Sequence, residues 1–341
     1  MPCCSNCFTH GFLRDFIKTS SSKTGKCTYC TSKNNQAVCD PSILTDLFQP
    51  VFDLYTVSTS GIFINDQIQL DWQIFSKDVS TKQQQKLLSD IVSDKKLVKK
   101  KVISRFSQVT TLIDKWNDFK NELQHENRFF PKKAIKREEL EELISYLAMK
   151  KEDYPDMLYR ARVKRTLISY CISEMGKPPK EKATAGRANP QGIPYYYLAS
   201  DQRTAISETR PYKSENVCVG KYKVSKKAKF IDLREPKKVI CPIGLDENSL
   251  YLLYKEHMPF LGHLCYTLSI PVLPYQKDLD YLPTQYLCEL IKDQYYDGIA
   301  FKSSLAKGDN YVIFNDSILN GTNVDTYTID DTVMRLVKVR T

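Results

Sequence analysis

The sequence predicts an α+β protein of two parts, an N-terminal zinc-binding helical domain over residues 1–150 and a mixed α/β domain over residues 151–341. Three observations predict this division. Two CxxC pairs stand near the N-terminus, helical periodicity follows them, and short strand patterns separated by turns fill the rest. A chain of 341 residues is also long enough for two domains, since a domain takes roughly 100–200 residues.

The first element is a cysteine-rich segment over residues 1–40. Cys4 and Cys7 form one CxxC pair and Cys27 and Cys30 form a second, with nineteen residues between the pairs. This spacing is typical of a structural site in which four thiolates hold Zn²⁺ in a closed tetrahedron. Cys3 could compete with Cys4 for the ion, and Cys39 is expected to be a bystander. The alternative is a set of free thiols in an irregular segment.

Helical patterns dominate the next hundred residues. Residues 82–123 are predicted to be helical because apolar residues recur every three, four or seven positions: Val98, Val102, Phe106, Val109, Ile113, Trp116 and Leu123. A second helix is expected after Pro131, with an apolar stripe of Leu140, Leu143, Ile144 and Leu147. Residues 44–75 fit either a strand or a buried helix, and both alternatives stay open.

The composition changes near Tyr154 and Pro155, where shorter elements begin. The stretch 176–192 is predicted to be a loop because glycine, proline and lysine recur in it. Four strands are expected later, at residues 195–198, 217–222, 229–233 and 311–314.

The net charge and the length of the apolar runs indicate which kinds of partner the protein could bind. The net charge of +10 is compatible with nucleic acid, with an anionic small ligand or with a merely basic surface. The densest basic run lacks interleaved aromatics, which argues against a nucleic-acid site, and we interpret it as one exposed helix face: Lys95, Lys96, Lys99, Lys100 and Lys101. No apolar run approaches about 18 residues, so no membrane span is expected.

The cysteine usage suggests a location. Eleven cysteines without a visible signal peptide indicate a reducing cytoplasm, where paired cysteines favour metal over disulfides. The sequence leaves the oligomeric state open, a homo-oligomer included.

The most informative stretch is GRANPQGIPYYYLA at residues 186–199, followed by TAISETRP at residues 204–211. It places an arginine, Arg187, on a loop shaped by glycine and proline, then an aromatic strand, then a carboxylate, Glu208, on a probable helix. A guanidinium suits phosphate, and tyrosines suit a heterocyclic ring. Gly186 and Gly192 would allow the backbone to approach a ligand closely.

Together with LYRAR at 158–162, LPTQY at 282–286 and DGIAFKSS at 297–304, these blocks resemble the RES domain family over about residues 155–320. The resemblance implies a fold related to ADP-ribosyltransferases, with NAD⁺ bound in a cleft between small sheets and cleaved at the nicotinamide–ribose bond. It also implies toxin activity and an antitoxin or other regulatory partner. The CxxC pairs and helices resemble the zinc-bearing, HEPN-associated segment that precedes some RES domains.

The resemblance assigns roles by position. The family arginine, glutamate and serine match Arg160, Glu208 and Ser303, which would be the catalytic set, with Arg162 and Ser304 as rivals. The expected cofactor-binding residues are Arg187, Tyr197, Arg162 and Tyr195. Lys302 departs from the family pattern, which often has proline or arginine at this position. This departure leaves the shape of the loop open.

Several functions compete at this stage. The first is an NAD⁺ glycohydrolase or phosphorylase of the RES type, whose acceptor would be water or phosphate. The second is an ADP-ribosyltransferase that modifies a macromolecule. The third is a module that binds a nucleotide without turnover. A nucleic-acid-binding zinc ribbon is a weaker alternative that rests on the positive charge.

Overall fold

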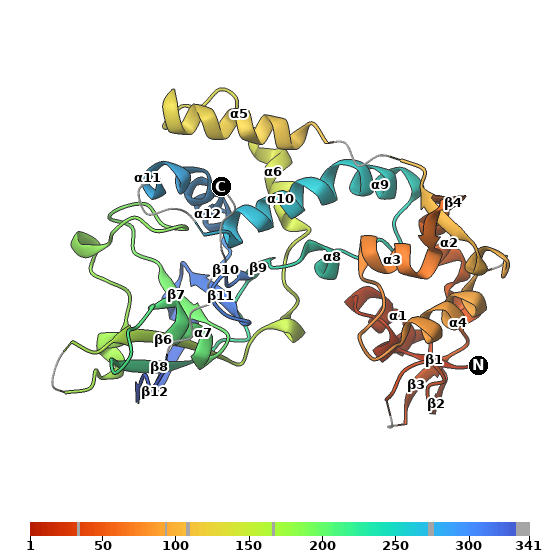
Figure 1. The fold of residues 1–341 in the computed structure, drawn as a ribbon, viewed down its shortest axis with the longest axis horizontal. Helices are drawn as coiled ribbons and strands as arrows, with labels where there is room; N and C mark the ends of the chain where they lie inside the picture. Colours follow the sequence, from red (N-terminus) through yellow and green to blue (C-terminus); the bar gives the residue numbers. More distant parts are fainter. Residues whose placement is uncertain (33–34, 93, 107–109, 166–167, 272–275, 332–341) are drawn as a thin grey trace. The chain divides into compact units, whose positions relative to one another are not determined.

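The computed structural model describes residues 1–32, 35–92, 94–106, 110–165, 168–271 and 276–331 (Figure 1). The chain divides into two compact units. The first comprises Met1–Asp114 and Glu235–Gly262, and the second comprises Lys115–Arg234 and His263–Thr341. The domain boundary that the sequence predicts near residue 150 falls within the second unit and stays a prediction.

The first unit combines helices with two small sheets. Strands β1 (Cys3–Cys4), β3 (Gln36–Cys39) and β2 (Lys23–Gly25) pair in that order, and β4 (Tyr55–Phe63) pairs with β5 (Lys101–Ser104). Its helices are α1 (Gly11–Ser20), α2 (Thr45–Asp53), α3 (Ile64–Trp72), α4 (Thr81–Ile91), α8 (Pro236–Val239) and α9 (Glu247–Leu252). The core is aromatic, with Phe8 contacting Phe48 and Phe75. The stretch 44–75 therefore contains both of the structures that its sequence left open.

The helix predicted over residues 82–123 is wrong in its middle. Helix α4 ends at Ile91, Val98 lies in a 3₁₀ turn, Val102 lies in β5, and a new helix α5 spans Leu112–His125. Val98 and Val102 are buried, so the apolar spacing of four is real, but a turn followed by a strand satisfies it as well as a helix does. Val109 lies outside the described residues.

The basic run is exposed, as expected, but it does not form a helix face. Its lysines lie around the 3₁₀ turn and at the start of β5. Strand β5 pairs with β4, so the backbone there is extended and the lysines do not share one helical stripe.

A sheet of seven strands organises the second unit. The order is β12 (Leu319–Thr328), β8 (Asn216–Val224), β6 (Met157–Val163), β7 (Tyr196–Ala199), β11 (Asp309–Ile313), β10 (Gly298–Lys302) and β9 (Phe230–Leu233). All neighbours are antiparallel except β9 and β10. The four strands predicted from sequence are confirmed as β7, β8, β9 and β11, with ends shifted by a few residues.

The sheet is nearly split in its middle. Strands β6 and β8 pair over seven positions, whereas β6 and β7 pair only where Tyr159 faces Ala199. Two half-sheets therefore meet at one residue pair and separate beyond it. This opening between β6 and β7 agrees with the cleft between small sheets that the sequence resemblance implies.

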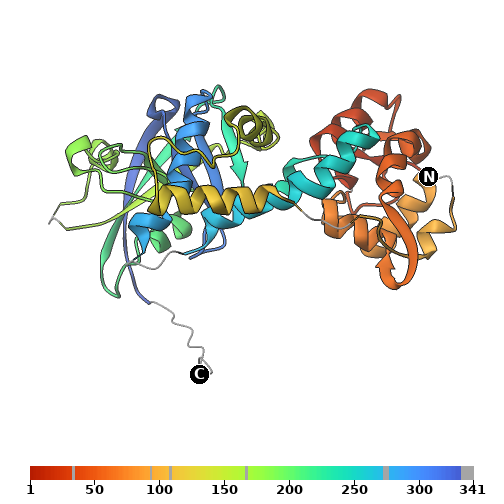
Figure 2. The same cartoon turned by 90° about the horizontal axis from the view of Figure 1, so that it is seen from above.

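Helices cover parts of this sheet (Figures 1 and 2). Helix α7 (Gln202–Glu208) packs against β6, β7, β8 and β11, and α12 (Leu282–Asp293) packs against β10 and against α6 (Arg137–Ser145). The short α11 (Lys277–Asp280) precedes α12. Helix α10 (Met258–Ser269) begins in the first unit and ends in the second. Helix α6 confirms the second predicted helix, with Leu140, Leu143 and Ile144 buried. No helix among the described residues is both long and apolar enough to cross a membrane.

Candidate functional site

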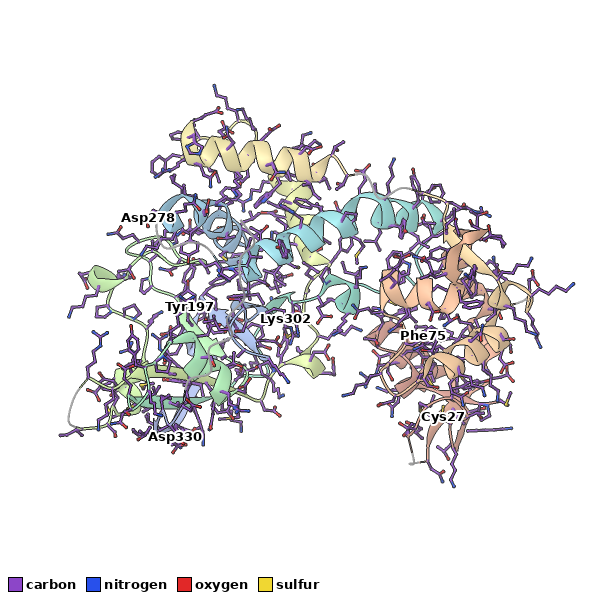
Figure 3. The ribbon with its side chains drawn as sticks, in the orientation of Figure 1. Cys27, Phe75, Tyr197, Asp278, Lys302 and Asp330 are labelled. Carbon is purple, nitrogen blue, oxygen red and sulfur yellow. The ribbon has the colours of Figure 1, made fainter. Side chains whose placement is uncertain are left out.

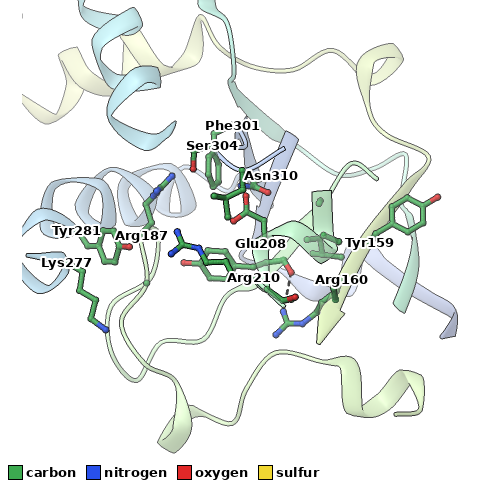
Figure 4. Close-up of a pocket in the computed structure, with 18 residues that line it drawn as sticks. Tyr159, Arg160, Arg187, Glu208, Arg210, Lys277, Tyr281, Phe301, Ser304 and Asn310 are labelled. Atoms are coloured by element: carbon green, nitrogen blue, oxygen red, sulfur yellow. Dashed lines mark hydrogen bonds between the residues drawn. The ribbon is translucent and has the colours of Figure 1, made fainter. Parts of the chain in front are cut away.

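A pocket of about 520 Å³ opens where β6 and β7 separate (Figure 4). Both strands contribute to its wall, together with the end of α7, the loop at residues 186–187 and the loop after β10. Its side chains include one carboxylate, several cations and several aromatic rings: Tyr159, Arg160, Arg187, Tyr197, Glu208, Arg210, Lys277, Tyr281, Phe301, Ser304 and Asn310.

The loop that carries Arg187 is held from two sides. The Tyr197 hydroxyl donates to Oδ1 of the buried Asn189 at 2.7 Å and accepts from the backbone N–H of Ala188 at 3.1 Å. From α12, Gln285 Nε2 donates to the carbonyl of Gly186 at 2.9 Å. The LPTQY block therefore acts on the pocket indirectly, by fixing this loop.

Gly186 is required by the loop itself. A Cβ at this position would lie 2.5 Å from Asn189 Oδ1 and 2.6 Å from the Tyr197 hydroxyl. A larger residue would displace the pair of hydrogen bonds that holds the loop. The close approach expected of Gly186 is thus an approach to Tyr197 and Asn189.

Arg187 lines the pocket, but its guanidinium is already engaged. Nη1 donates to the carbonyl of Leu268, and Nη2 donates to the carbonyl of Ile270 at 2.7 Å. Leu268 lies in the last turn of α10 and Ile270 follows its end, where the last C=O groups have no partner within the helix. A cation at a helix C-terminus is also favourable electrostatically. Arg187 therefore joins the pocket wall to the end of α10.

We expect Arg187→Ala to lower thermal stability as well as ligand affinity. The substitution removes two charge-assisted hydrogen bonds that are partly buried, which costs about 1.5–3 kcal/mol of unfolding free energy. Arg203→Ala, on an exposed arginine of α7 outside the pocket lining, is the control. Melting by circular dichroism should separate the two variants, and equal melting temperatures would contradict the capping role.

Of the two rival arginines on β6, only Arg160 lines the pocket. Its guanidinium lies 4.8 Å from the ring centre of Tyr196, and Nη1 donates to the carbonyl of Tyr197 at 3.4 Å. Arg162 instead donates to the carbonyls of Glu174 and Gly176, at 2.7 and 2.6 Å, and so fixes that loop. Burial, and secondly the charge of Arg162, lower the pKa of Arg160 to about 10, so it stays cationic at neutral pH.

Glu208 is the last residue of α7, and its carboxylate is held by two donors. The helix is positioned at its start by Asp201, whose side chain accepts from the backbone N–H of Thr204. At its end, Glu208 Oε1 accepts from Ser303 Oγ and from Asn310 Nδ2, each at 2.7 Å. Among the described residues, Oε2 of Glu208 has no such partner, so that oxygen remains available to a ligand.

The two candidate serines occupy different places. Ser303 Oγ accepts from the backbone N–H groups of Leu305 and Ala306, both at 3.1 Å, so its own proton points to Glu208. Ser303 is absent from the pocket lining among the described residues, and Ser304 is part of it. Ser303 thus orients the carboxylate, and Ser304 is the serine that a ligand would meet.

The two candidate tyrosines also separate. Tyr197 is 36% exposed and lines the pocket, whereas Tyr195 is 2% exposed and packs against Phe314 with ring centres 4.8 Å apart. Figure 3 labels Tyr197, which belongs to strand β7. The structure therefore does not bring Tyr195 to the pocket.

Six of the pocket side chains named above were not among the predicted site residues: Tyr159, Phe301, Asn310, Arg210, Lys277 and Tyr281. Arg210 stands two residues after Glu208 in a block that already drew attention, and its charge could have identified it. Asn310 follows Ser303 by seven positions across a hairpin turn, and no local pattern pairs it with Glu208. Lys302, the departure from the family pattern, forms an ion pair with Asp309 at 3.3 Å.

The predicted metal ligands form a separate cluster in the first unit. The Sγ atoms of Cys4, Cys7, Cys27 and Cys30 all lie within 4.8 Å of one another. The Cys4–Cys30 and Cys7–Cys27 sulfurs are 3.5 and 3.3 Å apart. Four sulfurs around Zn²⁺ at about 2.3 Å would be roughly 3.8 Å apart, so the cluster fits a tetrahedral zinc ion. Figure 3 labels Cys27 beside the three-stranded sheet.

Two donors support the thiolates, and the other N-terminal cysteines pair elsewhere. Gln36 Nε2 donates to Cys4 Sγ at 2.9 Å, and the backbone N–H of Tyr29 donates to Cys27 Sγ at 3.4 Å. Such donors stabilise the negative charge of ligating sulfurs. Cys3 faces Cys39 across β1 and β3, with sulfurs 3.5 Å apart. Cys3 therefore does not take the place of Cys4.

Comparison with known proteins finds a family match that covers the residues of the pocket. The family model described as RES domain matches residues 157–330, slightly more than half of the chain. A chain from the crystal structure of the M. tuberculosis MbcT–MbcA toxin–antitoxin complex is similar over 55% of this chain and 91% of that chain, with 11% identity and a TM-score of 0.33. No curated protein matches the sequence.

Proposed function

Because the chain belongs to the RES domain family, we propose that its second unit binds NAD⁺ in the pocket and cleaves the nicotinamide–ribose bond. The observation that carries the proposal is the held carboxylate of Glu208 in a pocket whose other charged side chains are cations. This arrangement suits a substrate in which a diphosphate is joined to a ribose that develops positive charge.

The chemistry depends on charge rather than on a nucleophile. Nicotinamide leaves NAD⁺ as a neutral molecule, and positive charge develops on the ribose ring. The carboxylate of Glu208 would stabilise that charge and bind a ribose hydroxyl through Oε2. Ser303 and Asn310 hold Oε1, so the carboxylate is oriented before the substrate arrives.

The other lining residues divide the remaining tasks. Arg160 supplies a cation on the β6 wall, Tyr197 supplies a ring against the nicotinamide ribose, and Ser304 supplies a hydroxyl. No histidine or cysteine is found among the described lining residues, so the lining offers no thiolate nucleophile and no imidazole base. With water as the acceptor the chain would be a glycohydrolase, with phosphate it would be a phosphorylase, and with a macromolecule it would be an ADP-ribosyltransferase.

The zinc site and a partner complete the proposal. Zn²⁺ held by the four cysteines has no open coordination position, so its role would be to stabilise the N-terminal segment. Depletion of NAD⁺ would be toxic to the cell that makes the enzyme. We therefore propose that an antitoxin or another regulatory protein limits the activity.

The proposal is tested by incubating the purified chain with NAD⁺ and measuring nicotinamide by chromatography, with and without phosphate. Release of nicotinamide with ADP-ribose indicates a glycohydrolase, and a phosphate-dependent product that carries an extra phosphate indicates a phosphorylase. If NAD⁺ binds and no nicotinamide appears in either condition, the module that binds without turnover is the better interpretation.

Asn310 is a positioning residue in this scheme, and its replacement should reduce turnover. We expect Asn310→Ala to lower kcat by about tenfold or more, since a hydrogen bond to a charged group contributes about 1.5–3 kcal/mol. KM should change little, because the lost bond orients Glu208 through Oε1 and leaves Oε2 available to the substrate. Asn323→Ala, at an exposed position of β12, is the control. Parental kcat in Asn310→Ala would contradict the role.

A further inference from the structure

The charged side chains of the pocket are unbalanced. Arg160, Arg187, Arg210 and Lys277 line it against the single carboxylate of Glu208. Like charges gathered in a pocket repel one another unless an anion joins them, so the pocket is suited to an anionic ligand. The question is which of these cations would contact that anion.

Arg187 is the cation that the sequence favours, but both of its terminal NH₂ groups already donate hydrogen bonds. Nη1 and Nη2 donate to carbonyls at the end of α10. To bind a phosphate with both of these groups, Arg187 would have to abandon the carbonyls and leave them unsatisfied. Arg187 is therefore better suited to holding the wall than to carrying the main phosphate contact.

Arg210 is different in two respects. Its guanidinium makes no hydrogen bond or ion pair with any other described residue, so all of its donors are available. Figure 4 shows its side chain extending from the end of α7 toward Arg187, on the other side of the pocket from Arg160. Lys277 and Tyr281 lie on this same side in Figure 4.

The backbone at Arg210 is strained. Its φ is 48°, in the left-handed region that residues with a side chain seldom adopt. The next residue is Pro211, and a following proline pushes the preceding residue toward extended backbone. Strained residues of this kind cluster at ligand clamps, where the conformation aims a side chain. Here it brings Arg210 into the pocket two residues after Glu208.

We propose that Arg210, assisted by Lys277, forms the subsite that binds the diphosphate of the ligand, and that Arg187 serves mainly to fix the pocket wall. The proposal deepens the proposed function and rests on it for the identity of the dinucleotide. The subsite can also be tested without the cleavage reaction. A nucleoside diphosphate such as ADP-ribose should bind, and a nucleoside without phosphate should not.

Binding of ADP-ribose by calorimetry tests the subsite without any turnover. We expect Arg210→Ala to raise the Kd for ADP-ribose about ten- to a hundredfold, Lys277→Ala to raise it less, and Arg203→Ala to leave it unchanged. Raising the salt concentration should weaken binding to the parent more than to Arg210→Ala. A parent that does not bind ADP-ribose, or an Arg210→Ala variant that binds it as tightly as the parent does, would overturn the proposal. Circular dichroism of each variant confirms that it is folded.

A second measurement separates this proposal from the proposed function. Nicotinamide riboside has the scissile bond but no diphosphate. For a catalytically active parent, Arg210→Ala should therefore lower kcat/KM for NAD⁺ and not for nicotinamide riboside. An equal loss on both substrates would overturn the subsite. A parent that binds ADP-ribose through Arg210 but never cleaves NAD⁺ would support the subsite and refute the proposed function.

Discussion

Replacing Glu208 by Gln is expected to reduce the rate of nicotinamide release by about 10²–10³ while leaving NAD⁺ affinity nearly unchanged. The glutamine oxygen can still accept from Ser303 and Asn310, so the side chain should keep its place. Its amide NH₂ would then face the ligand where the free carboxylate oxygen stood. The negative charge that opposes the developing ribosyl cation is lost, and this loss is felt mainly in the transition state.

Steady-state kinetics on NAD⁺ with a separate measurement of ADP-ribose binding checks this prediction. A fall in kcat with an unchanged Kd supports the electrostatic role. Glu181→Gln, at an exposed position outside the pocket lining, controls for the loss of one negative charge from the protein. If Glu208→Gln turned over NAD⁺ at the parental rate, the proposed mechanism would be wrong for this chain.

The hydrogen bond from Asn310 to Glu208 allows a further test with a double variant. If Asn310 acts through the carboxylate, its removal should cost little once the carboxylate has become an amide. The double variant Glu208→Gln/Asn310→Ala should therefore be about as slow as Glu208→Gln alone. A further tenfold loss in the double variant would mean that Asn310 acts on the substrate independently of Glu208.

Several of the predicted site residues line one pocket in the structure, but their hydrogen-bond partners could not be predicted from the sequence. Arg160, Glu208 and Tyr197 come from different blocks, and the half-sheets bring them to one opening. The partners of these residues are not visible in the sequence, because they lie far along the chain. Arg187 meets the end of α10 more than 80 positions later, and Ser303 meets Glu208 from 95 positions away. A local pattern shows which residue types are present, and only the fold shows which hydrogen bonds they make.

Sequence spacing predicted the cysteine cluster because its ligands come in pairs that are close along the chain. Two cysteines in a CxxC turn are brought together by the backbone of that turn, so the metal cluster could be predicted from spacing. The helix predicted over residues 82–123 failed because Val98 and Val102 satisfy a spacing of four in more than one backbone conformation. On the paired strand β5, Ile103 is 40% exposed and the preceding Val102 is buried, which is the alternation that the helical interpretation overlooked.

Removing one ligand from the cysteine cluster should have the largest effect on the stability of the N-terminal segment. We expect the parent chain to carry about one equivalent of zinc and Cys27→Ser to lose it, because a hydroxyl does not replace a thiolate as a zinc ligand. Strands β1, β2 and β3 are only two to four residues long, so they depend on the metal for much of their folding energy. Structural zinc contributes on the order of 10 kcal/mol to such segments.

Metal analysis and limited proteolysis over residues 1–40 measure both effects. Cys39→Ser and the exposed Cys171→Ser should each retain the zinc. Full zinc occupancy in Cys27→Ser, or its loss in Cys39→Ser, would show that the ligand set is different.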